Sequence, residues 1–135
     1  MGITLDIYKG NARKTTNQHG GKYYKDDYYI CSVDSRTAWL LVGYLIHVQK
    51  IDTAECQIDR KIKVSVLIDF VKRLDSVSMF DHIRVVEDKI GVQRGWFSNY
   101  EPQELLAEIM YAKYDISVKP KRLFEEEYVI IDAGW

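Results

Sequence analysis

Apolar and polar residues alternate near the N-terminus of the chain, as expected for a strand with one buried face. From Ile3 to Tyr8 the apolar side chains fall on every second position, so this segment is predicted to form a half-buried strand. The segment from Tyr23 to Val33 is dense in Tyr, Ile and Val and predicts a second strand that could pair with the first. The run from Tyr128 to Ile131 predicts a closing strand.

Between the first two strands lies a polar stretch that has almost nothing to bury. It is rich in Asn, Thr, Gln and Gly, residues that favour turns over regular structure. We therefore predict a flexible loop at about residues 9–22, the kind of long connection that in a small domain is often functional.

The longest apolar run of the chain predicts a buried helix. Asp34 and Ser35 supply a helix N-cap, and the pattern continues to about Gln49. Because residues 38–46 are apolar on every side, we expect this helix to be buried on most of its faces, at the centre of the fold.

Two further helices follow from apolar spacing and start signals. Ser65 is expected to cap one, and Pro102 suits the first position of the other, which should end near Tyr114 and Asp115. Their apolar stripes are Leu67, Phe70, Val71 and Leu74 in the first, and Leu105, Leu106, Ile109 and Met110 in the second.

Two segments have weaker patterns. Ile51 to Arg60 is polar and is predicted to be a connection. Residues 81–96 suit two short strands, because β-branched residues dominate, although the spacing would also suit a helix.

These elements fit one α+β domain over residues 1–135. Strands and helices mix without a regular strand–helix–strand rhythm, so we expect a mostly antiparallel sheet of about four to five strands. Three helices should pack on it, one of them largely buried.

The charge balance argues against two kinds of partner. With 19 basic and 20 acidic residues the net charge is −1, whereas nucleic-acid and polybasic membrane-surface binders usually carry a basic excess. The longest apolar run is about half of a membrane span, and the N-terminus does not resemble a signal peptide. We therefore expect a cytoplasmic protein that does not bind membranes.

Few residues suggest a catalytic or metal-binding site. His19, His47 and His82 lack the spacing of metal ligands, and Cys31 and Cys56 form neither a disulfide framework nor a C-x-x-C motif. A Cys–His pair stays open, because sequence cannot show whether thiol and imidazole meet. We predict no catalytic residue, no metal and no cofactor, and lean against an enzyme without excluding one.

The tyrosines and one basic segment indicate a binding surface. Ten of the 135 residues are Tyr, four of them close together, and residues 9–25 hold five cations and no acidic residue. Aromatic residues beside cations are typical of interfaces. The predicted partner-binding residues are Arg13, Lys14, His19, Tyr23, Tyr24, Tyr28 and Tyr29.

Three classes of function remain. The first is a small non-enzymatic inhibitor or regulator that binds another protein, of the phage anti-defence (anti-CRISPR) type or the toxin-immunity type; a phage-encoded protein would act in the host cytoplasm. The second is a small enzyme or nucleotide-binding protein whose site is built from scattered residues. The third is a nucleic-acid-binding protein that uses the basic segment at residues 9–25. The partner and the oligomeric state stay open.

Overall fold

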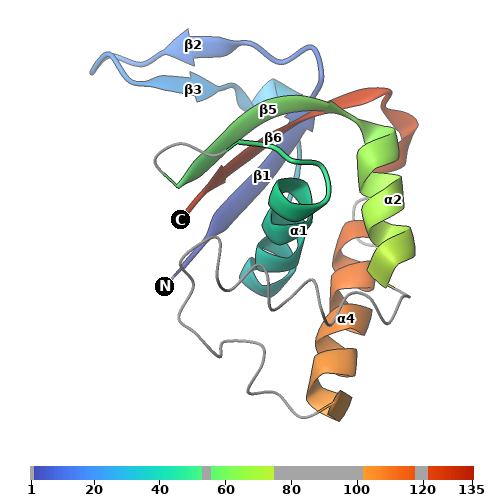
Figure 1. The fold of residues 1–135 in the computed structure, drawn as a ribbon. Coiled ribbons are helices and arrows are strands. Elements are labelled where there is room, and N and C mark those ends of the chain that lie inside the picture. The colour runs from blue at the N-terminus through green and yellow to red at the C-terminus, as the bar shows by residue number, and fades with distance from the viewer. Residues whose placement is uncertain (1, 53–55, 75–101, 118–121) are drawn as a thin grey trace.

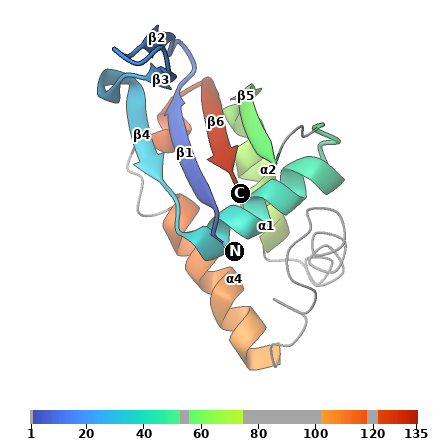
Figure 2. The same cartoon turned by 90° about the vertical axis from the view of Figure 1, so that its left-hand side faces the viewer.

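A four-stranded antiparallel sheet organises the fold (Figures 1 and 2). Its strands are β4 (Tyr29–Ser32), β1 (Thr4–Lys9), β6 (Tyr128–Gly134) and β5 (Gln57–Lys63), in that spatial order. The computed structural model describes residues 2–52, 56–74, 102–117 and 122–135. The predicted pairing of the first two strands is confirmed, since β1 and β4 are antiparallel neighbours.

Three helices belong to the described residues and lie on one side of this sheet, the first two against it and the third against those two helices (Figure 1). They are α1 (Ser35–His47), α2 (Val64–Leu74) and α4 (Pro102–Ser117). Side chains alternate across a strand, and most buried residues of β1, β5 and β6 fall on one face; the exceptions are Arg60 of β5, which is exposed, and Ile130 of β6, which is buried. The core positions on that face are Leu5, Ile7, Ile58, Ile62, Val129, Ile131 and Ala133. The predicted α+β class is confirmed.

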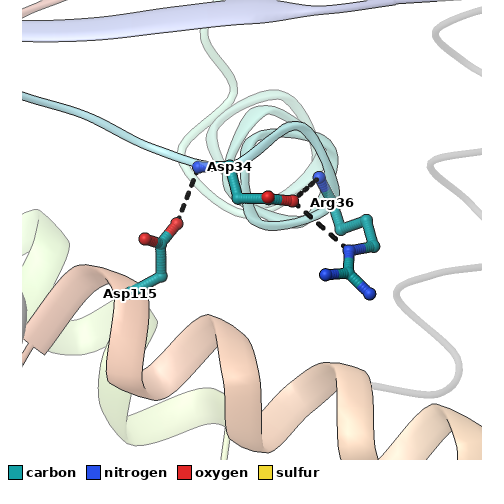
Figure 3. Close-up of polar contacts among 3 residues, drawn as sticks. All are labelled: Asp34, Arg36 and Asp115. Carbon is teal, nitrogen blue, oxygen red and sulfur yellow. Dashed lines mark hydrogen bonds and ion pairs between the residues drawn. The ribbon is translucent and has the colours of Figure 1, made fainter.

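Helix α1 is the buried helix that its apolar run predicts, with every residue from Thr37 to Leu45 inaccessible to solvent. Asp34 caps it as expected, because its carboxylate accepts a hydrogen bond from the backbone N–H of Arg36 at 3.0 Å (Figure 3). Asp115 of α4 reaches the same point and accepts the backbone N–H of Asp34 at 2.7 Å.

The other two helices differ from the prediction at their ends and on one face. Helix α2 begins at Val64, one residue before the expected cap Ser65, because β5 leads directly into it. Helix α4 starts at Pro102 as predicted but continues to Ser117. Met110, assigned to its buried stripe, is 65% exposed, whereas Ile109 is buried.

The segment expected to be a loop contains a β-hairpin. Strand β2 (Lys14–Thr16) pairs with β3 (Lys22–Tyr24), and the ribbon stands over the sheet on the side away from the helices (Figures 1 and 2). The prediction of one strand over Tyr23–Val33 is therefore wrong: β3 and β4 are separated by a 3₁₀ turn at Asp26–Tyr28. Flexibility of residues 9–22 stays a prediction.

A second strand was missed in the segment expected to be a connection. Residues 57–60 belong to β5, whose exposed side chains are nearly all charged, as is common on a sheet edge. The strands or helix expected at 81–96 lie outside the described residues. Within the described ranges, no helix is long and apolar enough to cross a membrane.

Candidate partner-binding surface

The face of the sheet away from the helices carries a row of three aspartates. The register places Asp6 of β1 opposite Asp132 of β6, and Asp132 opposite Asp59 of β5. Ser32 of β4 extends the row on the other side of Asp6. Like charges directly opposite each other destabilise a sheet, so this row requires compensating groups.

The hairpin supplies the compensation at Asp59. The hydroxyl of Tyr24 donates a hydrogen bond to the Asp59 carboxylate at 2.6 Å, and Lys14 forms an ion pair with the same carboxylate. Lys14 and Tyr24 are register partners in the hairpin, and the Lys14 ammonium lies 5.3 Å from the Tyr24 ring centre. One side of the hairpin is thereby fixed to the sheet.

Aromatic stacking adds to this attachment. The Tyr24 ring lies 4.8 Å from that of Tyr8 on β1, and Tyr8 meets Tyr29 edge-on at 6.0 Å. Such ring pairs contribute about 0.5–1.5 kcal/mol beyond the area they bury. Burial, together with the hydrogen bond to Asp59, raises the pKa of Tyr24, so its hydroxyl keeps its proton and remains a donor at neutral pH.

At the other end of the row, Asp6 receives its hydrogen bond from a residue of the sheet itself. Ser32 donates to Asp6, and the Tyr29 hydroxyl lies 2.8 Å from the Ser32 oxygen. Asp132 lies between Asp6 and Asp59, whose carboxylates each accept a hydrogen bond. Burial, with added repulsion from Asp59 and Asp6, raises its pKa, while Lys14 acts in the opposite direction.

Specific contacts constrain the backbone both where the chain enters the hairpin and at the hairpin tip. A Cβ at Gly10 would lie 2.7 Å from Tyr128 atoms, so only glycine fits where the chain leaves β1. At the tip, the Asn17 side chain accepts the backbone N–H groups of His19 and Gly21, each at 2.9 Å. Gly20 takes a positive φ of 83° there.

The outer side of the hairpin presents a different set of groups. Tyr23 pairs with Thr15 on this side and is 46% exposed. Arg13 and Lys25 adjoin Lys14 and Tyr24 just outside the two strands, and both are exposed. Lys25 has an extended backbone (φ −68°, ψ 149°). We call Arg13, Thr15, Tyr23 and Lys25 the outer hairpin face.

The seven predicted binding residues thus divide between two sides. Lys14 and Tyr24 face the sheet and bind Asp59, and their role in partner binding stays a prediction. Tyr29 is 45% exposed but anchored to Ser32, and Tyr28 is half-buried in the 3₁₀ turn. His19 is exposed at the tip of the hairpin, Arg13 is exposed just before β2, and Tyr23 is exposed on the outer side.

The aspartate row escaped the sequence analysis, although a signal for it exists. Asp6 and Asp132 each stand between two buried residues of a strand, so alternation alone points them away from the core. Asp59 has no such signal, because β5 itself was not recognised.

A shallow pocket lies near the edge strand β4. It encloses about 410 Å³ and is lined by Tyr29, Ile30, Lys9, Asp27, Arg122, Glu125 and Glu126. Five of the seven side chains are charged, whereas small-molecule sites are mainly apolar with a few polar groups.

Among residues 2–52, 56–74, 102–117 and 122–135, no group of three or more His, Cys, Asp or Glu side chains could hold a metal ion. Comparisons with known protein families, curated proteins and solved structures find no match.

Proposed function

We propose that the protein is a small non-enzymatic binding protein that inhibits or regulates a larger protein through the hairpin β2–β3. The observation that carries this proposal is the division of the hairpin into two sides. Its inner side is attached to Asp59 by Tyr24 and Lys14, while Tyr23 remains exposed on the outer side. A pre-ordered aromatic group binds with little loss of conformational entropy.

The pocket beside β4 favours this proposal over the alternative of a small enzyme or nucleotide-binding protein. Its lining mixes Lys9 and Arg122 with three carboxylates, and neither Cys31 nor His47 contributes to it. Inhibitors of the anti-defence and the toxin-immunity type both require a surface complementary to one target, so the proposal covers both.

The test is affinity capture with the tagged full chain from lysate of its native cell, at two salt concentrations, followed by titration of the captured protein. Tyr23→Ala should weaken binding at least tenfold, about 1.4 kcal/mol, because central aromatic residues carry much of an interface's energy. The matched control is Tyr114→Ala on α4, since Tyr114 is 52% exposed and lies on another element. Equal affinity of the two variants would contradict the proposal, as would capture of nucleic acid in place of protein.

A further inference from the structure

The charge of the chain is distributed unevenly. Residues 9–25 carry five cations and no acidic residue, although the whole chain has a net charge of −1, so the remaining residues together carry −6. A concentrated charge of one sign steers association toward surfaces of the opposite sign.

The fold neutralises one of these five cations and leaves others available. Lys14 is paired with Asp59 on the inner side. Within the described part of the chain, no ion pair or cation–ring contact involves Arg13, Lys22 or Lys25. Arg13 and Lys25 share the outer hairpin face with the exposed ring of Tyr23.

We propose that the outer hairpin face docks on an acidic surface of a partner protein, with Arg13 and Lys25 contacting its carboxylates around the Tyr23 ring. This inference rests on the proposed function and adds the chemistry of the partner. Arg can bind a carboxylate through two parallel hydrogen bonds, and Tyr supplies apolar contact area between the charges.

A protein surface fits better than a nucleic acid. Binding to nucleic acid depends on many phosphate contacts, and the outer hairpin face offers two cations. Asp26 and Asp27 are exposed directly after the hairpin, and the aspartate row lies beneath it. These carboxylates would repel an extended polyanion, whereas a compact acidic patch can avoid them.

The experiment compares two double variants of the full chain that change net charge equally. Arg13→Glu with Lys25→Glu reverses the outer hairpin face, whereas Lys50→Glu with Lys72→Glu reverses two exposed lysines outside the hairpin. The probes are a peptide of alternating Glu and Tyr and a thymidine oligonucleotide of equal charge. Binding is followed by amide chemical shifts at low ionic strength and at about 0.15 M.

We expect the peptide to shift the amides of residues 13–25. The hairpin double variant should weaken peptide binding at least tenfold, while the control pair should leave it within about threefold. The conservative pair Arg13→Lys with Lys25→Arg should retain binding, which separates loss of charge from loss of folding.

Three results with these two probes would overturn the inference. They are an absence of peptide-induced shifts in the hairpin, equal weakening by both double variants, and tighter binding of the oligonucleotide than of the peptide. If the captured partner binds the hairpin double variant as tightly as the native chain, while Tyr23→Ala still weakens it, the acidic-partner inference fails and the proposed function stands.

Discussion

The buried carboxylate of Asp115 accepts the backbone N–H of Asp34 at 2.7 Å and thereby ties α4 to the first residue before α1 (Figure 3). The Asp34 side chain in turn caps α1 through the N–H of Arg36. Two carboxylates therefore satisfy donors at one helix start, where backbone N–H groups have no partner within the helix.

Removing the Asp115 carboxylate should destabilise the fold. We expect Asp115→Ala to lower the free energy of unfolding by about 1.5–3 kcal/mol, because a part-buried N–H loses a charged acceptor. Asp115→Asn keeps an acceptor oxygen and should cost less, and Asp34→Ala should cost about 1 kcal/mol. Urea unfolding measures all three, with Tyr114→Ala as the exposed control. The interpretation is wrong if Asp115→Ala unfolds at the native midpoint.

Gly10 should tolerate no larger residue. A Cβ there would lie 2.7 Å from the carbonyl oxygen of Tyr128, and backbone cannot give way as a flexible side chain can. We expect Gly10→Ala to cost about 1–3 kcal/mol in thermal or urea unfolding. Gly134→Ala is the control, since a Cβ at Gly134 meets nothing within 4 Å. Equal stability of both variants would contradict the close approach.

Lys50 offers a stabilising substitution. It has a positive φ of 56° after α1, and the N–H of Ile51 bonds back to the Leu45 carbonyl at 3.1 Å, the arrangement in which glycine is preferred. Lys50→Gly should raise the free energy of unfolding by about 0.5–1 kcal/mol, because it relieves left-handed strain. Asp52→Gly has no positive φ to relieve and should not stabilise. A lower urea midpoint for Lys50→Gly would refute this.

Asp132 should make the stability of the folded protein decrease as the pH rises. Burial and the neighbouring Asp59 raise its pKa, so the folded state holds this proton more tightly than the unfolded chain. Its contribution to stability is therefore present below the unfolded pKa and is lost as pH rises through the folded pKa. Asp132→Asn should stabilise the protein at pH 7 by up to about 1 kcal/mol.

The same variant should lose its advantage in acid, because native Asp132 is itself protonated and neutral once the pH falls below its raised pKa. Urea midpoints at neutral and acid pH test both parts, with exposed Asp52→Asn as the control. Destabilisation by Asp132→Asn at pH 7 would contradict this prediction, because it would show that the negative charge of Asp132 stabilises the fold.

The local pattern of apolar and polar residues predicted the elements that are buried on all sides or on one regular face. The all-round apolar run at 38–46 gave α1, Pro102 gave the start of α4, and alternation gave β1. Strand β5 was missed because its edge position makes most of its residues charged, so the alternation carries little contrast. Met110 was assigned to the buried face of α4 in error, because helical spacing does not show which side of a helix packs against another element.

The sequence by itself determined the α+β class, the buried helix and the presence of a basic, tyrosine-rich segment. Only the tertiary structure decided which of that segment's residues are available. Lys14 and Tyr24 face Asp59, which lies 45 and 35 residues away in the chain, while Tyr23 faces outward. The reason is physical: local propensity depends on neighbouring residues, whereas pairing a carboxylate with distant partners depends on the register of the assembled sheet.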